Sequence, residues 1–188
     1  MVIDVKYMKK KIWDYFIMAK RISFALLPRR KKKVIGIVIH NTGNTGDSAW
    51  GNCHYFGSDG DNIRQAGAHF FIDQNGYIGR SIPMNRSAYA VGNPKGSYAP
   101  GPYYSTLNNN NTVSIELCDI MIKEPSEEML ASLDRLVKYI KKHCPNVKHI
   151  VRHWDIVRKE CPERYIKTAK NEKAWTKLHA RLMEDIAA

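Results

Sequence analysis

An unbroken apolar run is the feature of this sequence that most restricts its fold. Residues 34–39 read Val-Ile-Gly-Ile-Val-Ile, and His40 follows directly. β-Branched residues favour strands, and a strand without polar alternation must be covered on both faces. Because strands of this kind occur in sheets with helices on both sides, the run predicts a central strand of an α/β domain.

The rest of the chain alternates strand and helix signals, which predicts a central mixed β-sheet flanked by helices. The expected strands are 34–40, 69–73, 77–82, 112–118 and 148–152, of which the first and the last two are expected to be central. Helices are expected at 48–56, from Ser126 to Ile140 and at 172–186. Asn75-Gly76 predicts a hairpin turn, and Ser126 before two glutamates predicts a capped helix. Residues 92–111, with four consecutive Asn, predict a long loop, and such loops are usually functional.

The positive charge is concentrated near the N-terminus. The net charge is +12, and residues 1–33 hold eleven of the thirty Lys and Arg against two Asp. We therefore divide the chain into a basic N-terminal extension, 1–33, and a domain over 34–188. Residues 8–27 predict a basic amphipathic helix, either free to bind an anionic surface or packed on the domain, and 28–33 a linker. A basic arm suits nucleic acid, an acidic membrane surface or an anionic cell-wall polymer.

The sequence gives little sign of membrane insertion or of a disulfide framework. No apolar run approaches the ~20 residues of a spanning helix. Lys20 and Arg21 interrupt the apolar stretch near the N-terminus, and no small-residue cleavage site follows, so we expect no cleaved signal peptide. Cys53, Cys118 and Cys144 form no CxxC pair and are expected to be buried, reduced thiols.

Three residues with metal-binding side chains follow predicted strands. His40 ends the first strand, His153 follows the strand over 148–152, and Cys161 comes eight residues later. Sheet enzymes place their sites at strand ends, so these side chains are expected to converge. Two imidazoles and a thiolate suit zinc, and three protein ligands leave a fourth position open for water or substrate. Each residue alone also has a structural interpretation, as a core histidine or a cysteine packed before Pro162.

Five motifs, in order, resemble the family 2 N-acetylmuramoyl-L-alanine amidases, whose fold is shared with animal peptidoglycan recognition proteins and phage lysozyme-amidases. The motifs are Ile37-Val-Ile-His-Asn-Thr-Gly43, Ala68-His-Phe-Phe-Ile-Asp73 with Asn75-Gly76, Ala88-Tyr-Ala-Val-Gly92, Val113-Ser-Ile-Glu-Leu117, and Arg152-His-Trp-Asp155 with Lys159-Glu-Cys-Pro162. The sequence most resembles endolysins of clostridial phages and prophages, and this resemblance includes its opening residues 2–7. The resemblance implies hydrolysis of the amide between the muramic acid lactyl group and L-alanine in peptidoglycan.

The resemblance also implies roles for individual residues. The implied zinc ligands are His40, His153 and Cys161. Glu116 is implied as the proton-transfer group and Lys159 as the group facing the developing oxyanion. Their structural alternatives are an ion-paired strand carboxylate and a solvated loop lysine. Another branch of the family uses a Tyr where this chain has Ala68, which favours the branch that uses Glu.

Three further positions carry expectations. Ala90 replaces a histidine that family members often have, a departure that concerns a substrate contact and not the zinc ligands. Asp155, two residues after His153, is expected to orient a ligand. His69 is expected to have a structural role, packed beneath the site.

The implied partner is peptidoglycan, bound by an endolysin or autolysin that is made in the cytoplasm and reaches the wall by a holin-type route or on lysis, with secretion as the alternative. A second hypothesis is a non-catalytic peptidoglycan-recognition module, which the presence of Cys161, Glu116 and Lys159 disfavours. A third is a nucleic-acid binder, inferred from charge alone. Because the chain lacks RNA-binding signatures and its charge sits in one arm, no nucleic-acid partner is expected.

Overall fold

The computed structural model describes residues 16–18, 29–57, 66–92 and 96–187. Six strands of these ranges form one sheet in the order β1-β4-β3-β5-β2-β6. The strands are β1 (Phe16–Met18), β2 (Gly36–Asn41), β3 (Phe70–Ile72), β4 (Ile78–Arg80), β5 (Thr112–Leu117) and β6 (His149–Arg152). Only β3 and β4 pair antiparallel, so the predicted mixed sheet is confirmed. The prediction that 148–152 is a central strand is wrong, because β6 lies at the sheet edge and pairs with β2 alone.

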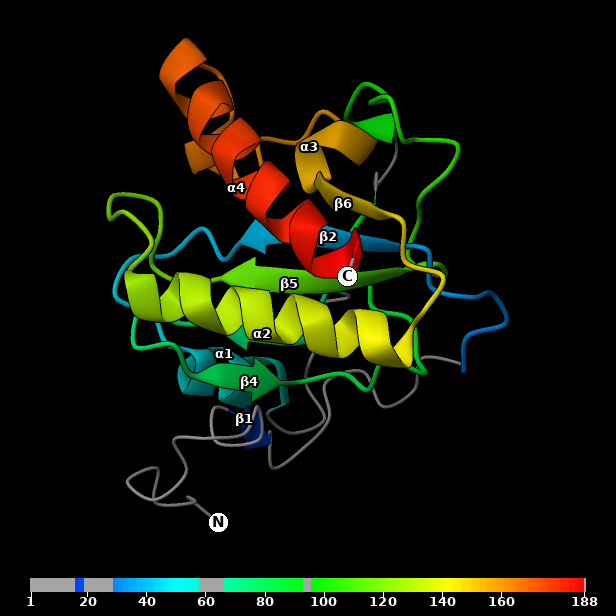
Figure 1. Cartoon of the computed structure of the whole chain (residues 1–188), viewed down its shortest axis with the longest axis horizontal. Coiled ribbons are helices and arrows are strands. Elements are labelled where there is room, and N and C mark those ends of the chain that lie inside the picture. Colours follow the sequence, from blue (N-terminus) through cyan, green and yellow to red (C-terminus); the bar gives the residue numbers. More distant parts are fainter. Residues whose placement is uncertain (1–15, 19–28, 58–65, 93–95, 188) are drawn as a thin grey trace.

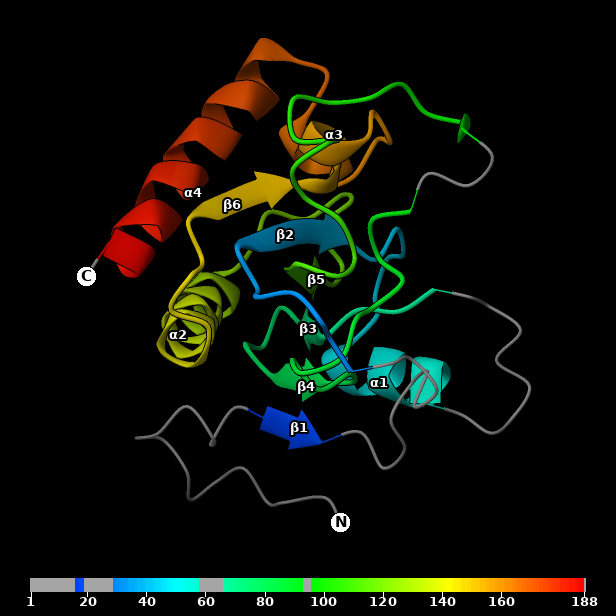
Figure 2. The ribbon, with the colours of Figure 1, turned by 90° about the vertical axis from the view of Figure 1, so that its right-hand side faces the viewer.

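Helices cover both faces of the sheet. As Figures 1 and 2 show, α2 (Glu127–His143) and α4 (Ala169–Ala187) lie on one face, and α1 (Ala49–Gly57) and α3 (His153–Ile156) on the other. Ile37 and Ile39 of β2 belong to the core beneath α2 and α4, whereas Val38 packs in a second cluster with Leu107 and Val151. Successive strand residues point to opposite faces, so the continuous apolar run is explained by two cores.

The predicted hairpin and helix cap are both confirmed. Gly76 adopts φ +78° in the turn between β3 and β4, and its backbone N–H donates to the Asp73 carbonyl at 2.9 Å. The Ser126 hydroxyl accepts from the Met129 N–H at 3.1 Å at the start of α2. The Ser126 N–H donates to Gln74 Oε1 at 2.9 Å, so the same serine joins α2 to the hairpin turn.

The other predicted elements are largely confirmed. Helices α1 and α4 match the predictions for 48–56 and 172–186, with small shifts at their ends, whereas the four-residue α3 was not predicted. The described part of 92–111 forms neither an α-helix nor a β-strand, as expected of the predicted loop. Cys53 and Cys118 are buried as predicted, while Cys144 is half-buried. No helix in the described ranges is long and apolar enough to cross a membrane.

Part of the N-terminal extension belongs to the sheet. Phe16–Met18 form β1 and pair in parallel with β4, so the helix predicted for 8–27 is wrong for these three residues. The remaining residues of that prediction lie outside the described ranges.

Arg30, placed in the predicted linker, is packed into the domain. Its Nε donates to the Met84 carbonyl at 2.7 Å, and its Nη2 donates to the Thr112 carbonyl at 2.5 Å. The linker prediction is therefore wrong at Arg30, because its guanidinium joins separate segments of the fold. Residues 31–33, all lysines, are exposed.

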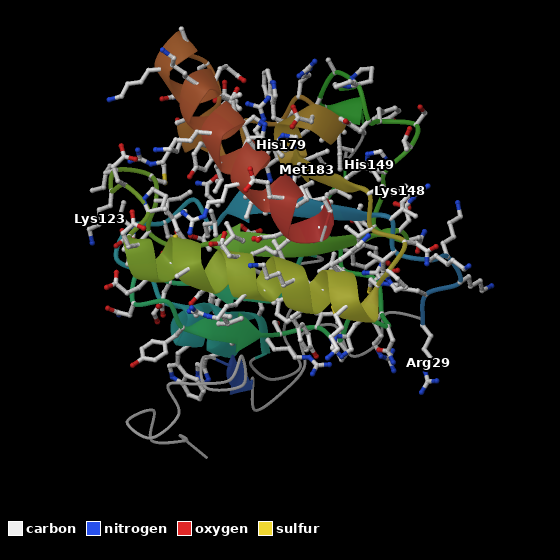
Figure 3. The ribbon with its side chains drawn as sticks, viewed as in Figure 1. Arg29, Lys123, Lys148, His149, His179 and Met183 are labelled. Carbon is white, nitrogen blue, oxygen red and sulfur yellow. The ribbon has the colours of Figure 1, made fainter. Side chains whose placement is uncertain are left out.

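Figure 3 marks the two ends of the parallel strands. Lys123 lies beyond the C-terminal end of β5, and Lys148 lies just before the start of β6 at the opposite end. Arg29 lies on the same side of the view as Lys148, away from the carboxyl ends of the strands.

Candidate active site

The fold brings the three predicted metal ligands together. His40 lies near the end of β2, and His153 begins α3 directly after the neighbouring parallel strand β6. Cys161 follows in the loop after α3, and its Sγ lies 3.6 Å from His40 Nδ1. The two imidazole rings are 4.8 Å apart between centroids, and the possible ligand atoms of all three residues lie within 4.8 Å of one another. Among the described residues, this is the one cluster of three or more His, Cys, Asp or Glu with such a spacing.

The chemistry of this cluster fits a zinc ion. His40 Nε2 and both ring nitrogens of His153 are buried without a hydrogen-bond partner among the described residues. Burial lowers the pKa of His40 well below its ordinary value, with smaller effects from His153 and Lys159, and burial and Lys159 lower that of His153 to about 3. Both imidazoles are therefore neutral near pH 7, the form in which histidine binds metals.

The thiol of Cys161 points to the same conclusion. Burial raises its pKa to about 12, with a further increase from Glu116. A thiolate in this position thus needs a compensating cation, and a soft thiolate with two imidazoles is a donor set that zinc favours. The set also leaves a position open, as in catalytic zinc sites.

Glu116 lies beside the cluster. Its Cα is the register partner of His40 across the β2–β5 pair. Burial raises the pKa of Glu116 to about 7, although the charge of Lys159 lowers it and that of Asp47 raises it slightly further. Glu116 Oε2 is buried and has no hydrogen-bond partner in the part of the chain described. A carboxyl group with these properties can exchange a proton near neutral pH.

Lys159 brings a positive charge to the same region. Its side chain is exposed, in the loop that leads to Cys161. The Val157 carbonyl accepts from the Lys159 N–H at 2.6 Å, and the Lys159 carbonyl accepts from the Cys161 N–H at 2.7 Å. These contacts fix the backbone between the lysine and the ligand. The charge of Lys159 contributes to the lowered pKa of His153 and opposes the raised pKa of Glu116.

A pocket of about 660 Å³ opens next to Glu116. Its walls come from the loop after β2, from α1, from β3 and from β5, and include Thr42, Asp47 and Phe71. This volume is within the range of small-molecule sites.

Asp47, which was not predicted as a site residue, holds one wall of this pocket. Its Oδ1 accepts from the Asp119 N–H at 2.7 Å, and its Oδ2 accepts from Asn52 Nδ2 at 2.7 Å. In return, Asp119 Oδ1 accepts from the Gly46 N–H at 2.7 Å. The loops that follow β2 and β5 are thereby joined to each other and to α1. The only sequence signal was an acidic residue at the end of a Gly-rich loop.

The contacts of Asp155 are with the backbone and side chain of Arg152, next to the candidate ligand His153. Among the contacts of the described residues, its carboxylate reaches no ligand side chain; it accepts from the Arg152 backbone N–H at 2.9 Å and from Arg152 Nε at 3.1 Å. It therefore closes the first turn of α3, which begins with His153.

His69 has the structural role that was predicted. Its Nδ1 accepts from the Ser114 N–H at 3.0 Å, and its Nε2 lies 3.1 Å from the Arg86 carbonyl oxygen and 2.6 Å from Arg30 Nη2. Burial, followed by the charge of Arg30, lowers the pKa of His69 to about 3.

Ala68 and Ala90 replace the Tyr and the His expected from the family resemblance, and both lie in ordinary packing environments. Ala68 is buried against Phe71 and Cys118. The Ala90 N–H donates to Asn109 Oδ1 at 3.1 Å. Asn109, in the loop over 92–111, thus holds the backbone at Ala90 in place.

Comparison with known proteins shows the family of this chain. The sequence matches the family of N-acetylmuramoyl-L-alanine amidases over residues 30–164. The N-acetylmuramoyl-L-alanine amidase CwlL of Bacillus licheniformis is 29% identical over 138 residues, which cover 71% of this chain and 37% of CwlL. The chain spans about two fifths of the length of the curated relatives it matches.

Solved structures share the fold. The N-acetylmuramoyl-L-alanine amidase LysC from Clostridium intestinale superposes with a TM-score of 0.57 at 22% identity, covering 87% of this chain and 96% of LysC. PlyL superposes with a TM-score of 0.65 at 19% identity, covering 89% of this chain and 94% of PlyL. Drosophila peptidoglycan recognition protein SD superposes with a TM-score of 0.57 at 16% identity, covering 78% of this chain and 87% of the Drosophila protein. The amidase and peptidoglycan recognition protein fold expected from the motifs is confirmed. Since the family match covers well over half of the residues, this chain belongs to the N-acetylmuramoyl-L-alanine amidase family.

Proposed function

We propose that this protein is a zinc-dependent N-acetylmuramoyl-L-alanine amidase that hydrolyses the amide between the muramic acid lactyl group and L-alanine of peptidoglycan. The observation that carries the proposal is the convergence of His40, His153 and Cys161 beside Glu116. The name of the CwlL relative and the family match support the same activity.

The proposed chemistry assigns each residue a separate task. His40, His153 and Cys161 would hold zinc, which when bound would supply a Lewis acid that lowers the pKa of water and polarises the amide carbonyl. Glu116, with its pKa raised to about 7, takes a proton from the attacking water and delivers it to the leaving amine of L-alanine. Lys159 stabilises the negative charge that develops on the carbonyl oxygen.

The pocket next to Glu116 is the proposed site of the stem peptide. It adjoins the proton-transfer group and is large enough for a short peptide segment. The wall that Asp47 holds in place would border this segment.

The test is mass spectrometry of purified peptidoglycan after digestion with and without a chelator. We expect stem peptides with new N-terminal L-alanine and glycan strands that keep their lactyl groups. Chelation should abolish both products, and added zinc should restore them. Cleavage at another bond would contradict the proposed reaction, and unchanged cleavage after verified metal removal would contradict zinc dependence.

The second candidate is a wall-recognition module that binds peptidoglycan without cleaving it. Its support is the shared fold of Drosophila peptidoglycan recognition protein SD. The same digestion separates the two candidates, because a recognition module would bind the wall and release no peptide. We favour the enzyme because Glu116 and the cluster of three ligands are present together.

The proposed setting is that of an endolysin or autolysin. The protein would be made in the cytoplasm and reach the wall by a holin-type route or on lysis, with secretion as the alternative. Exposed lysines of the N-terminal extension would add electrostatic attraction to anionic cell-wall polymer or to a membrane surface.

A further inference from the structure

Arg152 occupies the junction between the sheet and the candidate metal centre. It is the last residue of β6 and directly precedes His153. Its side chain is only 8% exposed. Burial alone would lower the pKa of Arg152, but hydrogen bonds and charge from Asp155 and Glu172 outweigh burial and raise it. The guanidinium therefore remains charged inside the protein, and its position is fixed by the groups that neutralise it.

One side of the guanidinium holds the segment that carries His153. Arg152 Nη2 donates to Asp155 Oδ1 at 2.9 Å, and Arg152 Nε donates to Asp155 Oδ2 at 3.1 Å. The same Oδ2 accepts from the Arg152 backbone N–H, which closes the first turn of α3. The backbone direction of His153 thus depends on this carboxylate–guanidinium pair.

The other side holds the segment that follows Cys161. Arg152 Nη1 donates to the Tyr165 carbonyl at 2.5 Å. Tyr165 ends the short 3₁₀ helix η4 (Glu163–Tyr165), which begins two residues after Cys161. The Trp154 N–H also donates to the Cys161 carbonyl at 2.9 Å. One buried arginine therefore joins the two segments that carry the second and third ligands.

The remaining contacts of Arg152 come from α4. Nη1 donates to both carboxylate oxygens of Glu172, at 2.8 and 2.9 Å, and the guanidinium lies 5.2 Å from the centre of the Trp175 ring. Both residues lie beyond residue 164, where the family match ends. In Figures 1 and 2 the N-terminal end of α4 lies at the same end of the molecule as α3, and the labelled His179 and Met183 follow the helix onward in Figure 3.

We propose that α4 is a positioning element of the metal centre, which acts through Glu172 and Trp175 on Arg152 and thereby fixes His153 and Cys161 relative to each other. This inference rests on the proposed function, because it presupposes that zinc binds at this site. Arg152, Glu172 and Trp175 are positioning residues and do not touch the metal or the substrate. The planar guanidinium is required, since it meets two carboxylates, a carbonyl and an aromatic ring in fixed directions that a lysine ammonium does not reproduce.

The test measures zinc affinity of the full chain by competition with a chromogenic chelator. Arg152→Lys keeps the charge but loses the fixed geometry, and Glu172→Ala removes a carboxylate that is 48% exposed, so the latter variant should fold. Outer partners of metal ligands typically contribute ~10–100-fold to metal affinity, and we expect a loss of about tenfold for each variant. The matched control is Arg181→Gln, which breaks a different ion pair of α4, with Asp134 of α2.

The outcomes separate positioning from general stability. Weaker zinc binding in Arg152→Lys and Glu172→Ala, with parental affinity in Arg181→Gln, would support the inference. Parental affinity in the first two variants would overturn it. An equal loss in Arg181→Gln would also overturn it, because helix docking alone would then explain the effect. If the parent protein itself binds no zinc, the proposed metal centre fails first, and that result is recognisable without any variant.

Discussion

His40 and Glu116 are register partners on the neighbouring parallel strands β2 and β5. Residues in register on adjacent strands present their side chains on the same face of a sheet. The sheet therefore places a candidate proton-transfer group beside a candidate metal ligand without help from a loop. Because burial raises the pKa of Glu116 to about 7, this carboxyl group can both accept and donate a proton near neutral pH.

The first prediction concerns Glu116 and Lys159, for which we propose catalytic roles. Glu116→Gln and Lys159→Ala should keep zinc and the fold but lose turnover of peptidoglycan by ~10²–10⁴-fold and ~10²–10³-fold, respectively. The measurement is kcat on a soluble muropeptide, with zinc content determined in the same samples. Glu124→Gln, which changes an exposed carboxylate paired with Arg164, is the control and should be fully active. Near-parental turnover in the first two variants would show that the role assignment is wrong.

The second prediction concerns the metal. The purified protein should carry about one zinc, and His40→Ala, His153→Ala and Cys161→Ala should each lose most of it, because three-ligand sites depend on every ligand. Elemental analysis after gel filtration measures this loss. His54→Ala, at an exposed position on α1, is the control and should keep zinc. Stoichiometric zinc in all four variants would place the metal elsewhere.

The third prediction concerns the packing of the loop over 92–111 on α3. A Cβ atom at Gly101 would lie 2.4 Å from the Asp155 carbonyl oxygen, so Gly101→Ala must push the loop away from α3. We expect a loss of ~1–3 kcal/mol in the free energy of unfolding, measured by urea denaturation. Gly92→Ala is the matched control, since a Cβ atom there meets no atom within 4 Å. Equal stability of the two variants would contradict the tight contact.

The fourth prediction concerns pH and His69. Its pKa is lowered from 6.5 to about 3 in the folded protein, so below pH 6.5 the unfolded chain binds a proton that the folded chain does not. The stabilisation by neutral His69 is therefore present above pH 6.5 and is lost as pH falls toward 3. Between pH 7 and pH 5 this group should lower the free energy of unfolding by about 2 kcal/mol.

The comparison with His69→Gln isolates this effect. Both proteins are unfolded with urea in the presence of a chelator, so that the titration of His40 and His153 contributes equally. The decrease in the free energy of unfolding between pH 7 and pH 5 should be smaller in His69→Gln than in the parent protein. An identical fall in both proteins would show that His69 is not the titrating group.

The fifth prediction concerns the basic extension. Replacing Lys31, Lys32 and Lys33 together by Gln should weaken binding to whole cell walls at low salt, because attraction to an anionic polymer is screened with a Debye length near ~8 Å at physiological ionic strength. Melting temperature and turnover of a soluble muropeptide should stay the same, since these side chains are exposed. Wall pelleting over a salt series measures the effect, and unchanged binding at every salt concentration would refute it.

Arg30→Gln is the contrasting variant. The contacts of Arg30 with Met84 and Thr112 lie inside the domain, so its loss should lower the melting temperature and affect cell walls and soluble substrate alike. Deleting residues 8–33 would mix these two effects, which is why the lysines are tested separately. A variant with parental melting temperature would contradict the structural role of Arg30.

Much of the site could be predicted from local sequence. The apolar run before His40 specified a buried strand. A residue at the end of such a strand lies at the carboxyl ends of the parallel strands, where sites form in sheet enzymes. Gly76 and Ser126 specified a turn and a cap because their conformational and hydrogen-bonding preferences act over only a few residues. Local periodicity also predicted five of the six strands in the described residues, although it placed β6 in the centre of the sheet.

The tertiary structure decided what depends on contacts between distant segments. Sequence proximity to His153 suggested that Asp155 orients a ligand, but not that its carboxylate binds Arg152, whose other partners Tyr165 and Glu172 come from later segments. In the same way, Arg30 lies in a run of basic residues that gives no sign of a structural role. It packs into the domain because Met84 and Thr112 present carbonyl groups to its guanidinium. A buried charge is stable only where the folded chain brings acceptors to it, and no short stretch of sequence contains those acceptors. The sequence by itself therefore identified the candidate residues of the active site, and the tertiary structure determined what holds them in place.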